Sequence, residues 1–133
     1  MTQTGERRLT VLVVEDEALV LTTVRELVLA FGYRVLGAAS AAEALRLCRE
    51  RLDPIDLLLA DVGLPGMTGP ELADQVRQLC PGIQVAFMSG LSDDQLSQAG
   101  VHLGDPLLLR KPFGHELLVG MVRQALGQPR PEP

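Results

Sequence analysis

The stretch "LLLADVGLPGMTG" (residues 57–69) joins an apolar run to a single carboxylate and then to a turn rich in Gly and Pro. The apolar run is short and bounded by turn residues, which predicts a buried strand at residues 55–60. A carboxylate directly after a buried strand costs free energy unless a charged or hydrogen-bonding partner offsets the cost. Asp61 is therefore the first candidate for a functional residue.

The rest of the chain alternates strand and helix patterns in the same way. Short apolar runs predict the strands, while helical spacing, capping boxes and terminal glycines predict the helices. The predicted strands are residues 9–14, 33–39, 55–60, 83–88 and 106–109. The predicted helices are residues 17–31, 41–52 and 69–79, a short helix after Ser92, and residues 116–126. This alternation predicts an α/β fold: a doubly wound, five-stranded parallel sheet with helices on both faces.

Length and charge limit the classes of function. The 133 residues suit one domain, predicted at residues 9–127, with an N-terminal extension at 1–8 and a disordered tail or the start of a linker at 128–133. A net charge of −5 without a basic cluster argues against a nucleic-acid partner. The sequence shows neither a signal-peptide core nor an apolar run long enough to span a bilayer. We therefore expect a cytoplasmic protein without a membrane partner.

Cys48 and Cys80 are the only cysteines of the chain. In a cytoplasmic protein the expected state is two reduced thiols. No nucleophile motif surrounds either residue, so a catalytic pair with His102 or His115 is not favoured, and both histidines are expected to be exposed to solvent.

Charged and polar side chains follow four of the five predicted strands. In a parallel sheet, ligands bind beyond the carboxyl ends of the strands. Glu15 and Asp16 follow the first strand, Asp61 the third, Ser89 the fourth and Lys111 the fifth. The lysine stands out because the chain has eleven arginines and only this one lysine.

Three carboxylates at one edge would repel one another unless a cation lay between them. All the donors are hard oxygen atoms, which predicts Mg²⁺, with Mn²⁺ as an alternative. A carboxylate nucleophile with a metal, an ammonium and a hydroxyl matches in-line phosphoryl transfer to a side chain. Each feature alone also fits a simpler interpretation, namely an acidic helix start, a helix cap or a Lys-Pro turn. Their occurrence together at the same strand ends favours a site.

The motifs "VLVVEDE", "LLLADVGLPGMTGPEL", "FMSG" and "RKPF" closely resemble the receiver domain of two-component response regulators, in order and spacing. The resemblance covers about residues 9–126. It implies a flavodoxin-like sheet of strand order 2-1-3-4-5. The chain resembles receivers of hybrid histidine kinases or single-domain response regulators more than receivers of DNA-binding regulators.

The resemblance also implies the activity. Asp61 corresponds to the phosphoacceptor, which takes a phosphoryl group from the phosphohistidine of a histidine kinase or histidine phosphotransfer protein. Asp16 corresponds to a direct Mg²⁺ ligand, Glu15 to a ligand acting through water, and Gly63 to a ligand through its backbone carbonyl. Such a domain catalyses its own phosphorylation and dephosphorylation and is not a conventional turnover enzyme.

Three further positions follow from the resemblance. Ser89 corresponds to the hydroxyl that follows the phosphoryl group, and Lys111 pairs with the phosphorylated carboxylate. The bond between Lys111 and Pro112 is expected to be cis. Leu108 occupies the switch position where the family often has Tyr or Phe, so the usual coupling through that ring is not expected here.

The segment "LSDDQLSQAGVHLGDP" contains two glycines and is weakly helical, so we expect the fourth helix to be short or mobile. Competing interpretations are a pseudo-receiver that only binds protein, a phosphohydrolase of the haloacid dehalogenase type, and a flavin carrier. A phosphohydrolase of this type needs a second Asp where Gly63 stands, and a flavin carrier needs a phosphate-binding loop where the chain has the acidic triplet Glu15, Asp16 and Glu17.

Overall fold

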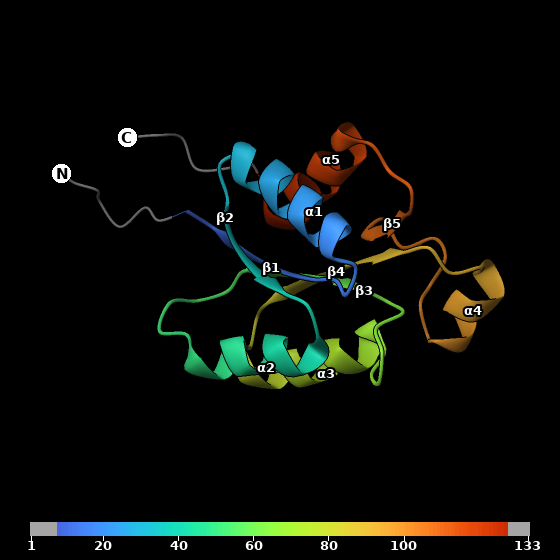
Figure 1. The fold of residues 1–133 in the computed structure, drawn as a ribbon, viewed down its shortest axis with the longest axis horizontal. Helices are drawn as coiled ribbons and strands as arrows, with labels where there is room; N and C mark the ends of the chain where they lie inside the picture. The colour runs from blue at the N-terminus through green and yellow to red at the C-terminus, as the bar shows by residue number, and fades with distance from the viewer. Residues whose placement is uncertain (1–7, 128–133) are drawn as a thin grey trace.

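The computed structural model describes residues 8–127 as five strands that alternate with five helices. Figure 1 shows the arrangement. The strands are β1 (Thr10–Val14), β2 (Arg34–Ala38), β3 (Leu57–Asp61), β4 (Gln84–Ser89) and β5 (Leu108–Arg110). The helices are α1 (Ala18–Ala30), α2 (Ala41–Glu50), α3 (Gly69–Leu79), α4 (Asp93–Gln98) and α5 (His115–Leu126).

The strands form one parallel sheet of order β2-β1-β3-β4-β5, which confirms the predicted topology. The central strands β1 and β3 are buried along their whole length, as their continuous apolar sequences require. The register places Val14 beside Ala60, and Ser89 beside Arg110. The carboxyl ends of β1, β3, β4 and β5 therefore meet at one edge of the sheet.

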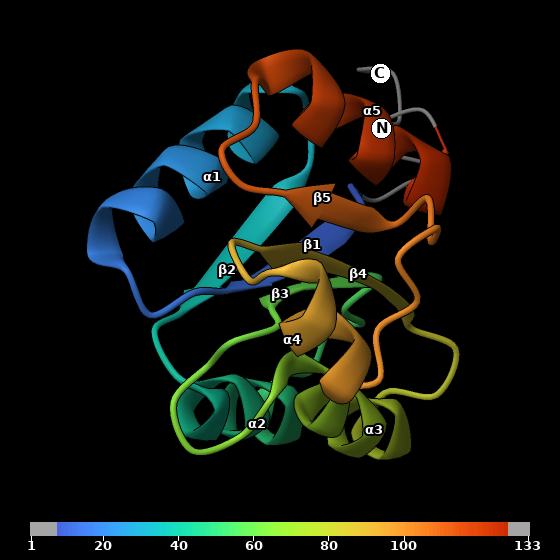
Figure 2. The ribbon, with the colours of Figure 1, turned by 90° about the vertical axis from the view of Figure 1, so that its right-hand side faces the viewer.

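Helices cover both faces of the sheet. Helices α1 and α5 lie on one face and α2 and α3 on the other, with the sheet between the two pairs (Figures 1 and 2). Alternate residues of the central strands point into two cores: Val13 and Leu59 pack under α1 and α5, and Leu12 and Leu58 pack under α2 and α3. Helix α4 lies apart from both pairs (Figure 1).

The predicted starts of α2, α3 and α4 are confirmed, whereas α1 and α5 each begin one residue from the predicted start. Ser40 accepts a hydrogen bond from the backbone N–H of Glu43, and Thr68 and Ser92 each form a complete capping box. Helix α3 also begins very close to β3: a Cβ added at Gly69 would lie 2.7 Å from the carbonyl oxygen of Asp61. Glycine is therefore required where α3 approaches the end of β3.

The strand starts differ from the prediction by one residue in β1, β2 and β4, and by two residues in β3 and β5. Strand β3 begins at Leu57 rather than at residue 55, because the carboxylate of Asp56 accepts a hydrogen bond from the N–H of Thr10 and ends the ladder there. The prediction of a strand at residues 106–109 is wrong at its start, which it places two residues too early. The oxygens of Asp105 accept the N–H groups of both Leu107 (2.8 Å) and Leu108 (3.1 Å), which makes a turn and delays β5 to Leu108.

Other expectations are confirmed. The Lys111–Pro112 peptide bond is cis. His102 and His115 are exposed, and both cysteines are free thiols. The predicted extension and tail lie outside the described residues, apart from Arg8. Among the described helices, none has both the length and the apolar character needed to cross a membrane.

Candidate functional site

The ends of β1, β3 and β5 bring together two carboxylates and the single lysine. The Nζ atom of Lys111 donates to Oδ2 of Asp61 at 2.9 Å and to Oε1 of Glu15 at 2.5 Å. It also lies 3.6 Å from a carboxylate oxygen of Glu17. Lys111 therefore bridges acidic groups that would otherwise repel one another.

Burial makes this bridge electrostatically strong. Glu15 is fully buried, and Asp61 is 7% exposed. Burial raises the pKa of Glu15 above its ordinary value, although the hydrogen bond from Lys111 acts in the opposite direction. Burial alone would lower the pKa of Lys111, but the hydrogen bonds to Asp61 and Glu15 raise it by more, so the pKa of Lys111 lies above its ordinary value. The ammonium therefore stays charged at neutral pH.

The backbone fixes both buried carboxylates in place. The N–H of Gly63 donates to Oδ1 of Asp61 at 3.0 Å, and the N–H of Glu17 donates to Oε2 of Glu15 at 3.0 Å. Each carboxylate thus accepts a backbone hydrogen bond with one oxygen and a hydrogen bond from Lys111 with the other.

The acidic side chains could also hold a cation. Carboxylate oxygens of Glu15, Asp16 and Asp61 lie within 4.8 Å of one another. They are hard oxygen donors, which suits Mg²⁺. A pocket with a volume of about 270 Å³ opens beside them. Its lining residues are Asp16, Glu17, Asp61, Gly63, Gly90, Leu91 and Lys111.

Ser89 ends β4 and is fully buried next to this edge. Its hydroxyl oxygen accepts a hydrogen bond from the N–H of Leu91 at 2.9 Å, and its carbonyl accepts the N–H of Lys111 at 2.8 Å. Ser89 is not among the described residues that line the pocket. Its hydrogen bonds instead join the start of the loop after β4 to the end of β5.

Leu108, which the resemblance assigns to the switch position, is half-buried. It packs against a small apolar cluster of Val62, Leu96 and Val101. The side chain thus fills space between β5 and α4, and it carries no polar atom that could reach the site.

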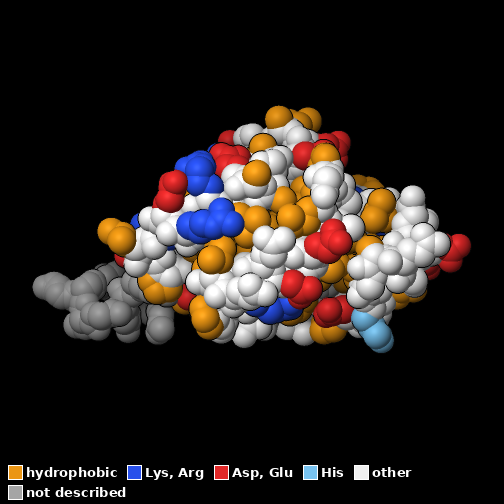
Figure 3. Space-filling model, turned by 90° about the horizontal axis from the view of Figure 1, so that it is seen from below, with side chains coloured by type: hydrophobic (Ala, Val, Ile, Leu, Met, Phe, Trp, Pro, Cys, Tyr) orange, Lys and Arg blue, Asp and Glu red, His pale blue; other side chains and the backbone are white. Residues whose placement is uncertain are grey.

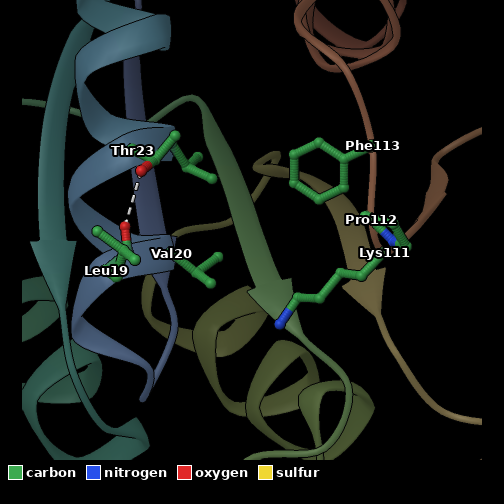
Figure 4. A pocket seen from close by; sticks show the side chains of 7 residues that line it. Leu19, Val20, Thr23, Lys111, Pro112 and Phe113 are labelled. Carbon is green, nitrogen blue, oxygen red and sulfur yellow. Dashed lines mark hydrogen bonds between the residues drawn. The ribbon is translucent and has the colours of Figure 1, made fainter.

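A second, apolar pocket adjoins the acidic one. Its volume is about 490 Å³, and it lies between α1 and the segment after β5. Leu19 and Val20 of α1 face Lys111, Pro112 and Phe113 across it (Figure 4). Leu19 is 78% exposed at its rim. Lys111 lines both pockets, so the apolar surface leads directly to the acidic cluster.

The structure adds two residues to those expected at the site. Glu17 belongs to the acidic triplet after β1, but only the fold shows its carboxylate near Lys111. Leu91 carries no sequence signal. Its side chain lies 3.5 Å from where a Cβ of Gly63 would be, at the mouth of the pocket. Such a contact depends on the tertiary approach of two loops and could not be found from spacing.

Comparison with known proteins agrees with this geometry. Residues 11–123 match the family described as response regulator receiver domain. The chain is 35% identical over 120 residues to the sensor kinase CckA of Brucella abortus, covering 88% of this chain but 12% of that kinase. Other curated relatives are also matched over less than two thirds of their length.

Solved structures are similar over nearly the whole domain. The receiver domain of the hybrid histidine kinase CckA superimposes with a TM-score of 0.72 and 37% identity, covering 88% of this chain and 98% of that one. The chemotaxis protein CheY4 of Vibrio cholerae superimposes with a TM-score of 0.77 and 27% identity, covering 90% and 100%. The fold, the acidic edge of the sheet and the family match agree, and the chain belongs to the response regulator receiver domain family.

Proposed function

We propose that this receiver domain accepts a phosphoryl group on Asp61 from the phosphohistidine of a histidine kinase or histidine phosphotransfer protein, in a reaction that depends on Mg²⁺. The observation that carries the proposal is the buried cluster in which Lys111 bridges Asp61 and Glu15. Two buried carboxylates repel each other, so a domain that only binds protein would gain no stability from placing them together beside a single ammonium group.

In the proposed reaction a carboxylate oxygen of Asp61 attacks the phosphorus atom. The P–N bond to the donor histidine breaks, and the imidazole leaves with the electron pair of that bond. Lys111 holds a phosphoryl oxygen by hydrogen bonding, and the hydroxyl of Ser89 turns toward another. The N–H of Gly63 keeps Asp61 oriented throughout.

Asp16, Asp61 and the backbone carbonyl of Gly63 would hold Mg²⁺, and Glu15 would act through a water molecule. The ion would neutralise charge on the phosphoryl oxygens. The geometric support is the approach of the three carboxylates to within 4.8 Å of one another.

The partner side of the proposal rests on the apolar pocket. An exposed apolar surface that ends at Lys111 lets a protein dock with its phosphohistidine over Asp61. The matched relatives include sensor kinases. Later attack by water would release the phosphate, and the signal would pass by protein contact in the cytoplasm.

Intact-mass spectrometry with acetyl phosphate tests the proposal. With Mg²⁺, the wild type should gain about 80 Da, the mass of one phosphoryl group. Asp61→Asn should gain nothing. Asp74→Asn, which changes an exposed aspartate on α3, should react like the wild type.

An equal mass gain in Asp61→Asn would remove Asp61 as the acceptor. No gain in the wild type would favour the pseudo-receiver that only binds protein. Phosphate release with repeated turnover of the donor, lost in Asp61→Asn and without a detectable phosphorylated protein, would point to a phosphohydrolase.

A further inference from the structure

The two cysteines lie together, although 31 residues separate them in sequence. Cys48 is in the last turn of α2 and is 8% exposed, while Cys80 caps the C-terminus of α3 and is half-buried. Both belong to the core under α2 and α3, and both line the same surface pocket. Burial, and then the neighbouring Cys80, raise the pKa of Cys48 to about 12.

A surface pocket gives access to this pair. Its volume is about 290 Å³, and Cys48, Cys80 and Arg51 are among its lining residues. The Nε and Nη2 atoms of Arg51 are buried there without a hydrogen-bond acceptor, and Asp53 lies 3.8 Å away as an ion-pair partner. The pocket is therefore lined by the half-buried thiol of Cys80, the buried thiol of Cys48 and an incompletely satisfied cation.

The pocket is far from the phosphorylation site. Its lining includes Ile55 and Pro81, which precede β3 and β4, whereas Asp61 is the last residue of β3. The face formed by α2 and α3 carries apolar, acidic and basic side chains mixed together (Figure 3). A chemical change at the thiols would therefore leave the acidic cluster in place.

We propose that Cys48 and Cys80 are a redox-sensitive pair that closes to an intramolecular disulfide when the protein meets an anionic peptide disulfide such as oxidised glutathione. The proposal does not depend on the phosphoacceptor role of Asp61. The guanidinium of Arg51 favours an oxidant that carries carboxylates. Two reduced thiols, as the sequence predicts, are the starting state.

The chemistry proceeds by two thiol–disulfide exchanges. Cys80 is the more exposed thiol, so it loses its proton and attacks one sulfur of the oxidant. The S–S bond of the oxidant breaks, and the first glutathione leaves and takes up a proton. Cys48 then gives up its proton and attacks the sulfur of Cys80, which expels the second glutathione. The pair loses two electrons and two protons, and the oxidant is reduced to two thiols.

Oxidation should stabilise the domain. The disulfide would close a loop of 33 residues, from Cys48 to Cys80, that contains β3 and α3. Cross-linking such a loop restricts the unfolded chain. The melting temperature should rise by roughly 5–10 °C.

The test treats the reduced full chain with oxidised glutathione, blocks remaining thiols with iodoacetamide under denaturing conditions, and measures intact mass. The expected product is a monomer without alkylation that is about 2 Da lighter than the reduced chain. Peptide mapping should join Cys48 to Cys80, and the melting temperature should rise. Mg²⁺-dependent reaction with acetyl phosphate should be the same before and after oxidation.

Two variants sharpen the result. Cys48→Ala should stop at a glutathione adduct on Cys80, about 305 Da heavier than the free thiol. Cys80→Ser should take up no glutathione at Cys48, because that thiol is buried. A wild type that stops at the Cys80 adduct, or joins two chains through Cys80, would overturn the proposal. So would an oxidised sample in which both cysteines are still alkylated.

Discussion

Lys111 is the residue on which the electrostatics of the site depend. Its Nζ atom is the shared donor to Asp61 and Glu15, and its side chain is 17% exposed. If one member of a buried ion pair is removed, the other charge stays buried without a partner. The resulting loss in the free energy of unfolding is larger than the net contribution of the intact pair. The lysine therefore has a structural role in the unphosphorylated state, besides the proposed catalytic one.

Lys111→Met should lower the free energy of unfolding by about 2–3 kcal/mol, because Glu15 and Asp61 would then face each other without a cation. Urea denaturation with EDTA present measures this loss. Arg110→Met is the matched control, because Arg110 pairs with Asp93 at the surface and should contribute less than about 1 kcal/mol. Equal losses in the two variants would show that Lys111 does not compensate buried charge.

Leu91 lines the pocket that contains Asp61, so we expect its side chain to restrict the access of water to that carboxylate. Leu91→Ala should speed hydrolysis of the aspartyl phosphate by roughly threefold, a small change in barrier that suits the loss of one shielding side chain. The decay of the phosphorylated mass after donor removal gives the rate. Leu117→Ala, an exposed position on α5, should decay like the wild type. An unchanged or slower decay in Leu91→Ala would remove Leu91 from this role.

At the scale of elements, α4 differs from the other helices. It has six residues and buries only Leu96, whereas α5 buries four residues. Its N-terminal end is held by an exposed ion pair of 2.9 Å between Arg110 and Asp93, and Arg110 also donates to the carbonyl of Leu91. The short length predicted for this helix is confirmed. Its mobility stays a prediction.

Backbone amides of α4 should exchange with deuterium at least tenfold faster than those of α5, because local opening of α4 exposes little apolar surface. Hydrogen exchange followed by mass spectrometry compares the two helices in one sample, so α5 is an internal control. Equally slow exchange in both helices would contradict a mobile α4.

The element boundaries show where sequence patterns lose information. The apolar runs of β1 and β3 predict central strands because both faces of these strands are buried. The apolar run predicts too early a start for β5, because Asp105 accepts two backbone N–H groups and forms a turn. An apolar run contains no sign of this side-chain competition for backbone donors.

At the scale of the whole molecule, the sheet order determines which residues meet. Alternation of strands and helices predicts a parallel sheet, but the order 2-1-3-4-5 is implied only by the family resemblance. Given that order, the meeting of Glu15, Asp61 and Lys111 could be predicted. The proximity of Cys48 and Cys80 could not, because it depends on how the ends of α2 and α3 pack.

Stability should fall as the pH rises above about 9. Cys48 has an ordinary pKa of 9.0 that burial raises to about 12. Between these values the unfolded chain loses the proton and the folded chain keeps it, so folding weakens by up to about 1.4 kcal/mol per pH unit. The pKa of Tyr33 is raised by burial and that of Lys111 by its hydrogen bonds, so both add to the fall at higher pH.

Urea denaturation at about pH 8 and pH 10, with a reductant present, measures this dependence. The free energy of unfolding should decrease less for Cys48→Ala than for the wild type. Cys80→Ser is the control that keeps the buried thiol. The same decrease in all three proteins would show that the Cys48 thiol does not resist ionisation.

The central claim is that Asp61 is the group that accepts phosphorus. Borohydride reduces an aspartyl phosphate to homoserine, so peptide sequencing by mass spectrometry locates the acceptor after reaction with acetyl phosphate. We expect homoserine at position 61 alone, formed with Mg²⁺ and absent when EDTA replaces it. Homoserine at position 16, at several aspartates, or to the same extent without a divalent ion would contradict the account.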